Sequence, residues 1–181
     1  FTGELPGDAD AEELGAQKRV ISALVDGIRV VNLYVPNGSS LRSEKYSYKL
    51  NWMGCLERYL RSAETRDEPL CVVGDFTIGP DARDLHNPDR LTGGIMASEA
   101  ERDALLKVLG SNLGDAFRLF ESGSGHWSWW DYRSGAWNRD SGWRIDHIYL
   151  SSDLQELARS CSIDKEDRGR EQPSDHAPVV V

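Results

Sequence analysis

The sequence predicts an α+β fold that forms one domain. A chain of 181 residues is long enough to bury a sizeable core and falls within the size of a single domain. Strand-like and helix-like patterns both occur, but they do not alternate regularly, which favours α+β layers over a doubly wound parallel sheet. No internal repeat or linker divides the chain, so we assign residues 1–181 to one domain.

The composition is that of a soluble protein, with 39% hydrophobic and 28% charged residues. No apolar run approaches the roughly 18 residues that a membrane span needs, so we expect no membrane association. Cys55, Cys71 and Cys161 are scattered and lack the spacing of a metal finger, which is typical of reduced thiols in a cytoplasmic protein. We therefore expect a cytoplasmic protein. For its oligomeric state we expect a monomer.

The net charge of −9 disfavours a protein that binds nucleic acid by bulk electrostatics, because neutralising phosphates requires Lys and Arg. The charge does not exclude a nuclease. A local cationic groove and a bound divalent cation can offset phosphate charge while the rest of the surface stays acidic.

The amino-terminal third begins with a stretch that has no hydrophobic periodicity, residues 1–17, which we interpret as a loop. Because the first residue is Phe1 and not methionine, we expect the chain to be a fragment of a longer protein. Residues 20–24 and 28–35 are rich in β-branched side chains, and Asp26-Gly27 between them predicts a β-hairpin. Residues 46–63 change to the period of an amphipathic helix, with Trp52 on its apolar stripe and therefore in the core.

The middle of the chain predicts a short buried strand over residues 69–74 and a helix that ends near residue 109. Ser98 is the expected N-cap of that helix, Glu101 completes a capping box, and Gly110 ends it. Residues 113–120 fit either a short helix or an extended segment. Residues 144–150 form a further predicted strand, 151–153 a turn, and 173–181 a polar segment that enters a last buried strand.

Five of the six tryptophans fall between positions 127 and 143. Aromatic faces that alternate with arginines can stack on an unpaired base or on the sugar beside a missing base. The alternative is an aromatic mini-core under a loop, because tryptophans bury large areas and cluster for that reason.

Three carboxylates share one sequence context. Asp75, Asp146 and Asp175 each lie at an apolar strand or just beyond one, where packed scaffolds tend to display catalytic groups. Several carboxylates on one rim would form a hard oxygen site suited to Mg²⁺ or Mn²⁺. Taken singly, each aspartate also fits a turn or a cap.

The positions of the four histidines indicate different roles for them. His147 follows Asp146 within a strand and so faces away from it, which indicates a structural role. His176 precedes Ala-Pro at a strand entrance, where it could bind a phosphoryl oxygen or exchange a proton. His86 and His126 lack metal-ligand spacing, and we interpret both as surface residues.

The chain has no Gly-rich phosphate loop, no Gly-x-Ser-x-Gly elbow and no Cys-x-x-Cys pair, which disfavours nucleotide-cofactor, serine-hydrolase and zinc chemistry. Metal-assisted attack of water on a phosphoester remains. In that reaction a divalent cation would stabilise charge on phosphorus, an aspartate would orient or deprotonate the water, and His176 would steady an oxygen.

Five segments occur in one order along the chain: Asn32 to Gly38, Gly74 to Thr77, Trp129 to Ser134, Arg144 to Asp146, and Ser174 to Pro178. With these segments the chain resembles, over almost its whole length, the exonuclease III family, the abasic-site endonuclease branch of the endonuclease/exonuclease/phosphatase superfamily. The resemblance implies a four-layered α/β sandwich, two packed mixed β-sheets flanked by helices. It also implies Mg²⁺- or Mn²⁺-dependent hydrolysis of double-stranded DNA at abasic sites and 3′ ends.

The resemblance assigns roles to individual residues. Asp75 would orient or activate the water, and Asp146 would hold His176 against the scissile phosphate. The remaining assignments are Tyr34 and Thr77 as phosphate or transition-state contacts, Asp75 and Asp175 as metal ligands, and Trp129, Asn37 and Arg133 as DNA contacts. Thr77 departs from the asparagine that most of the family has there. The family's amino-terminal portion, with its main metal glutamate, is absent from these residues, so the chain alone is expected to be inactive.

Two alternatives use the same observations. One keeps the fold and the metal chemistry but changes the substrate to a lipid or inositol phosphate, against which the aromatic segment weighs. The other is a catalytically dead DNA-binding protein, motivated by Thr77 and by the absent glutamate.

Overall fold

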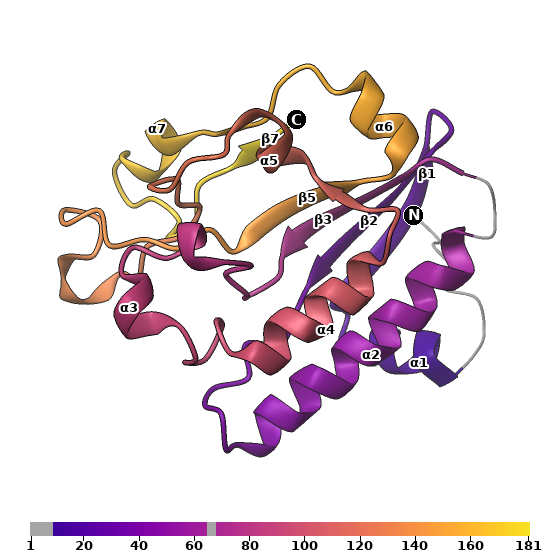
Figure 1. The fold of residues 1–181 in the computed structure, drawn as a ribbon, viewed down its shortest axis with the longest axis horizontal. Helices are drawn as coiled ribbons and strands as arrows, with labels where there is room; N and C mark the ends of the chain where they lie inside the picture. Colours follow the sequence, from indigo (N-terminus) through magenta and orange to yellow (C-terminus); the bar gives the residue numbers. More distant parts are fainter. Residues whose placement is uncertain (1–8, 65–67) are drawn as a thin grey trace.

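The computed structural model describes residues 9–64 and 68–181, and its centre is a mixed five-stranded sheet (Figure 1). The strand order is β1-β2-β3-β5-β4, and only β2 and β3 are parallel. The strands are β1 (Val20–Val25), β2 (Ile28–Tyr34), β3 (Leu70–Asp75), β4 (Gly114–Asp115) and β5 (Asp146–Leu150). Two further strands, β6 (Ser162–Ile163) and β7 (Val179–Val180), form a separate antiparallel pair.

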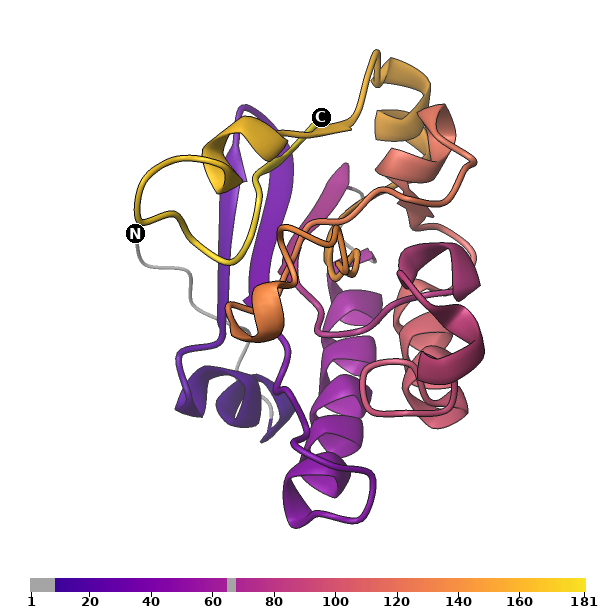
Figure 2. The same ribbon diagram turned by 90° about the vertical axis from the view of Figure 1, so that its left-hand side faces the viewer.

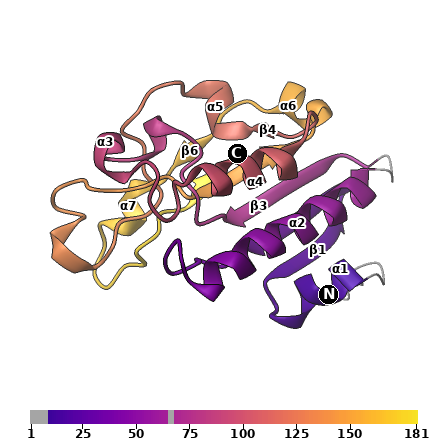
Figure 3. The ribbon, with the colours of Figure 1, turned by 60° about the horizontal axis from the view of Figure 1, so that its bottom comes forward.

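The helices α1 (Ala9–Ala16), α2 (Glu44–Glu64) and α4 (Glu99–Leu109) gather against one face of the sheet (Figure 3). Trp52 and Leu56 of α2 are fully buried and pack with Val31 of β2 and Val72 of β3 in the main core. Successive side chains of a strand point to opposite faces, so Val30 and Val73 lie on the other face of the sheet. The helices therefore leave one sheet face for the groove described below.

The hairpin and the two main helices confirm the sequence predictions. Asp26 and Gly27 have φ angles of 49° and 83°, the pair of positive values that a two-residue type I′ turn requires. Ser98 accepts a hydrogen bond from the Glu101 amide, and the Glu101 side chain bonds back to Ser98, which completes the capping box of α4. Gly110 ends α4 at a φ of 56°.

Three local predictions were wrong. The opening stretch is not all loop, since α1 covers its second half and buries Leu14, while residues 1–8 lie outside the described part. Residues 151–153 begin α6 (Ser152–Leu157) and do not form a simple turn. The last strand is not buried, because Val180 in β7 is 54% exposed at a two-stranded edge.

Residues 113–120 contain both of the predicted alternatives, first a short extended segment and then a short helix. The segment pairs with β5 as β4 and continues as α5 (Ala116–Phe120), because the side chain of Asp115 accepts the first free amides of that helix. The remaining short elements are η1 (Ala82–Asp84), α3 (Pro88–Leu91), η2 (Arg133–Gly135) and α7 (Lys165–Arg168). In the part of the chain that the structure describes, no helix has the length and apolar character to cross a membrane.

The described residues form a layered α/β arrangement and contain only the β6–β7 pair as a second sheet. Figure 2 looks onto the end of the main sheet where the loops after β3 and before β5 meet the carboxy-terminal segment. The candidate catalytic residues lie at this end.

Candidate active site

Strand pairing brings Tyr34, Asp75 and Asp146 into one row across the sheet. Tyr34 at the end of β2 is the register partner of Asp75 at the end of β3, and Asp75 is the partner of Asp146 at the start of β5. Side chains directly opposite one another share a face, so all three lie on the face away from the helices. Tyr34 is 48% exposed, with the Arg19 guanidinium 4.8 Å from its ring centre.

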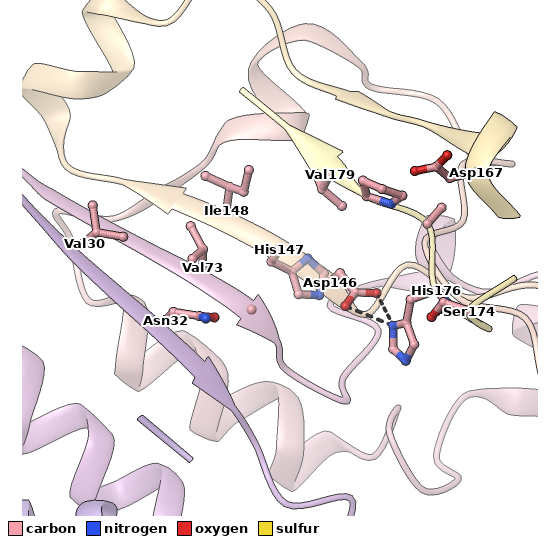
Figure 4. Close-up of a pocket in the computed structure, with 13 residues that line it drawn as sticks. Val30, Asn32, Val73, Asp146, His147, Ile148, Asp167, Ser174, His176 and Val179 are labelled. Carbon is pink, nitrogen blue, oxygen red and sulfur yellow. Dashed lines mark hydrogen bonds and ion pairs between the residues drawn. The ribbon is translucent and has the colours of Figure 1, made fainter. Parts of the chain in front are cut away.

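His176 is held by Asp146 from the far end of the chain. Its Nδ1 lies 2.9 Å from Oδ2 and 3.1 Å from Oδ1 of Asp146, and Figure 4 shows the other ring nitrogen turned away from that carboxylate. Burial tends to lower the pKa of His176, but the hydrogen bond and the charge of Asp146, with further help from Asp75 and Asp175, raise it overall. The pairing therefore favours a charged imidazolium beside the groove.

An open groove of about 760 Å³ runs along this face of the sheet (Figure 4). Asp146 and His176 line one end of it, and the side chains of Val30, Asn32 and Val73 line the sheet floor. The groove is therefore polar and titratable where the strands end and apolar farther along the sheet.

Asp75 is the most perturbed carboxylate of the site. Burial, and next the negative charge of Asp146, raise its pKa to about 7, although the Thr77 amide and the charges of His176 and Lys49 act in the opposite direction. Two carboxylates held this close repel each other, and a divalent cation or a shared proton relieves the repulsion.

The donor set fits a magnesium ion in part. Mg²⁺ is usually bound through one or two carboxylates together with substrate phosphate and water, and Asp75, one of the two predicted ligands, supplies one such carboxylate. Asp175, the other predicted ligand, accepts a hydrogen bond of 2.9 Å from Nε1 of Trp129. Within residues 9–64 and 68–181, no three His, Cys, Asp or Glu side chains come together in a way that could hold a metal ion.

The aromatic segment divides into two parts. Trp127, Trp130 and Trp143 are buried and form small cores under the loops, as the packing alternative predicts. Trp129 is only half-buried, pairs through its backbone with both Trp143 and His176, and has its ring centre 6.5 Å from that of His176. Of the cluster, Trp129 is therefore the tryptophan that the structure brings to the site.

The side chain of Thr77 is buried and is not placed to contact a phosphate. Thr77 is only 2% exposed, and its hydroxyl donates a hydrogen bond of 3.2 Å to the Pro36 carbonyl. Its amide donates to Oδ1 of Asp75 at 2.8 Å. Its φ of 49° is a left-handed conformation that is unfavourable for a β-branched residue and easier for asparagine.

The two other predicted DNA contacts lie on exposed loops. Asn37 caps its own turn by accepting the Ser39 amide at 3.2 Å. The Arg133 side chain is 86% exposed, forms an ion pair with Asp131 two residues earlier, and does not line the groove.

Two buried residues with no role predicted from the sequence support the site. Ser128 is fully buried, and its hydroxyl accepts the amides of Ile145 and Asp146, both at 3.0 Å, which fixes the start of β5. Arg144 is also buried and bonds to Asp84 at 2.6 Å and to Asp115 at 2.7 Å. Partners this distant along the chain leave no local pattern by which to recognise them.

His147 has the structural role that its strand position predicted. It is buried, its Nδ1 lies 3.0 Å from an Arg144 nitrogen, and its Nε2 lies 3.0 Å from the Ile78 carbonyl. Burial, and next the positive charge of Arg144, lower its pKa to about 4. At neutral pH the ring is therefore uncharged.

The structure is a layered α/β fold with a carboxylate–histidine pair at the end of its strands, and the comparisons identify its family. A profile of the endonuclease/exonuclease/phosphatase family matches residues 4–176. The chain therefore belongs to this family, in its exonuclease III and AP endonuclease branch.

Three relatives illustrate the similarity. Exodeoxyribonuclease III of Haemophilus influenzae is 33% identical over 176 residues, 91% of this chain and 66% of the relative. A 3′ phosphatase from Neisseria bound to a product DNA hairpin superposes with a TM-score of 0.87 at 37% identity. An AP endonuclease from Archaeoglobus fulgidus superposes with a TM-score of 0.84 at 36% identity. Each superposition covers 89% of this chain and 63% of the solved chain, so the chain spans just under two thirds of the length of these three relatives.

The raised pKa of Asp75 predicts that its ionisation destabilises the fold. Between its ordinary pKa of 3.8 and the folded value of about 7, the folded state binds more protons than the unfolded state, so stability falls as pH rises through that window. We expect Asp75→Asn to remove this loss. Urea unfolding of the whole protein and of its Asp75→Asn variant in EDTA at pH 4.5, 6 and 7.5 measures it, and a constant difference between their unfolding free energies would contradict the assignment.

Proposed function

We propose that the protein is a metal-dependent DNA-repair nuclease that hydrolyses phosphodiesters of double-stranded DNA at abasic sites and at 3′ ends. The observation that carries this proposal is the Asp146–His176 pair beside a carboxylate, Asp75, whose pKa is about 7. Relatives named as an exodeoxyribonuclease III, an AP endonuclease and a DNA-bound 3′ phosphatase support the substrate class. Because the chain spans about two thirds of these proteins, the proposal concerns the whole protein.

The proposed proton transfers follow from the raised pKa values of Asp75 and His176. A carboxylate whose pKa is near neutrality is suited to orient an attacking water and to accept its proton, which is the role we assign to Asp75. Asp146 holds His176 by Nδ1, so the opposite ring nitrogen is left to donate to a phosphoryl oxygen. Tyr34, in register with Asp75, donates its hydroxyl to the same phosphate.

A divalent cation, Mg²⁺ or Mn²⁺, would supply Lewis-acid stabilisation of the charge that develops on phosphorus. We assign Asp75 and Asp175 as its protein ligands in this chain, with further ligands from the glutamate that the family resemblance implies upstream. The upstream portion would also complete the four-layered sandwich.

DNA contacts are assigned to the aromatic segment and the neighbouring loops. The indole of Trp129 is fixed at its edge by Asp175 and is only half-buried, so its face is suited to stack on an abasic sugar or a base. Exposed Asn37 and Arg133 add polar and cationic contacts at the rim. We further propose a cytoplasmic monomer.

One observation favours a second candidate, a protein that binds DNA without cutting it. The hydroxyl of Thr77 is buried on a backbone carbonyl, so a donor that the resemblance implies at this position is not presented to a phosphate.

A nicking assay on a duplex with a single abasic site tests the proposed function. The whole protein is expected to cut with Mg²⁺ and to stop in EDTA, and His176→Ala to lower kcat by about 10²–10⁴-fold because it removes a group that acts on the phosphate. His86→Ala, at an exposed loop, is the matched control. Binding without nicking would support the second candidate, and phosphate release from an inositol phosphate instead would move the substrate to that class.

The 181 residues alone are expected to be inactive and to melt without cooperativity. The reason is that the sheet face carrying Val30 and Val73 is left open as a groove floor. Calorimetry and the same nicking assay on this chain provide the measurement. A cooperative transition together with Mg²⁺-dependent cleavage would contradict the expectation.

Substitutions at Thr77 distinguish a structural role of its hydroxyl from a contact with the substrate. Thr77→Val removes only the hydroxyl, so we expect kcat to change by less than about threefold and stability to fall by about 1 kcal/mol, the typical worth of one hydrogen bond. Thr77→Asn suits the left-handed backbone and adds an amide donor, so we expect kcat to rise by at least about tenfold, since one preorganised donor is typically worth about 10²–10³ in rate. A large loss of kcat in Thr77→Val would show that the hydroxyl does contact the substrate.

A further inference from the structure

The loop that follows Asp75 is held by side chains from three different elements. Its successive carbonyls at positions 77, 78 and 79 each have one side-chain partner. Nζ of Lys49 in α2 donates to the Thr77 carbonyl at 2.8 Å. Nε2 of His147 in β5 lies 3.0 Å from the Ile78 carbonyl, and Nε of Arg102 in α4 donates to the Gly79 carbonyl at 3.0 Å.

The amides of the same loop are also bonded. Phe76 donates to the Ile145 carbonyl at 2.9 Å and Gly79 to the Met96 carbonyl at 2.7 Å. The Thr77 amide donates to Asp75 itself. A β-branched residue with a φ of 49° persists only where its surroundings determine the conformation more strongly than its own preference does. Here the bonds on both sides of Thr77 supply that constraint.

Lys49 is a cation that the core holds at a cost. Its side chain and that of its ion-pair partner Glu101 are both 0% exposed, with 2.6 Å between Nζ and Oε1. Burying a charge is unfavourable unless it is paired and hydrogen-bonded. Glu101 already completes the capping box with Ser98, so the cap does not require a lysine. What Lys49 adds is the bond to the Thr77 carbonyl.

The geometry also decides which ring nitrogen of His147 carries the hydrogen. The guanidinium of Arg144 can only donate, so Nδ1 of the neutral His147 ring is the acceptor, and Nε2 carries the hydrogen that goes to the Ile78 carbonyl. His147 is thus a donor to the loop, held in that tautomer by a second buried cation.

We propose that Lys49, His147 and Arg102 are positioning residues, which together fix the loop 76–79 and, through the Thr77 amide, the carboxylate of Asp75. None of the three has to touch the substrate. The inference rests on the proposed function, because the loop has to be rigid only if Asp75 acts on a water at a defined place. Misplacement of a reacting group by about 1 Å is enough to cost about 10²-fold in rate.

We call Lys49, His147 and Arg102 the carbonyl clamp. The experiment uses the whole protein and substitutes two members of this clamp, Arg102 and Lys49. Arg102→Met removes one donor from a half-buried site, and Arg102→Lys returns a donor there. Lys49→Met paired with Glu101→Gln removes the second donor without leaving a buried carboxylate unpaired. Lys107→Met, which removes an exposed cation from the same helix as Arg102, is the matched control.

We expect each clamp variant to lower kcat on the abasic duplex by at least about tenfold while KM changes by less than about threefold, because misplaced chemistry and not DNA binding is affected. Arg102→Lys should recover most of kcat, and Lys107→Met should match the unmodified protein. Faster hydrogen exchange of the Thr77 and Gly79 amides should accompany the loss.

Unchanged kcat in folded clamp variants, or a rise in KM with kcat unchanged, would overturn the proposal. Failure of Arg102→Lys to recover activity would also overturn it. If the unmodified protein cuts no DNA, the proposed function fails. Amide exchange then decides the clamp by itself, and unaltered exchange at Thr77 and Gly79 in Arg102→Met would overturn it.

Discussion

The pairing of β3 with β5 sets Asp75 directly opposite Asp146 on a sheet face that the helices do not cover. Burial, and next the negative charge of Asp146, raise the cost of ionising Asp75. The site relieves the repulsion in two ways: His176 binds Asp146, and the Thr77 amide binds Asp75. The proposed chemistry depends on this repulsion, because a divalent cation beside the two carboxylates would relieve it.

Several of the buried residues that support the site are charged, as are residues of the site itself. Lys49 with Glu101, and Arg144 with Asp84 and Asp115, place full charges in the interior between the sheet and the loops. Buried pairs of this kind add little net stability compared with well-packed apolar groups. Their effect here is to hold backbone groups in fixed positions, and the Lys49 and Arg144 networks both lead to the loop after Asp75.

In the proposed function the aromatic segment serves two purposes, packing and DNA recognition. Buried tryptophans form the small cores that shape the loop, and that shape brings Trp129 beside the carboxy-terminal segment and His176. A hydrogen bond to Asp175 then fixes the indole at its edge. Packing and the proposed recognition are therefore not alternatives for the segment as a whole, because the packed residues position the half-buried one.

Sequence alone determined what is decided within a few residues of the chain. The Asp26-Gly27 turn, the stripe around Trp52 and the Ser98 cap depend on local backbone and periodicity, so they could be predicted. The motif order also identified Asp146 and His176, residues that only the fold brings into contact. Strand register, the Lys49–Thr77 contact and the burial of the Thr77 hydroxyl were decided by tertiary structure. Lys49 and Thr77 are 28 residues apart and Asp75 and Asp146 are 71 apart, and their meeting is governed by packing of the whole sheet and leaves no local signal.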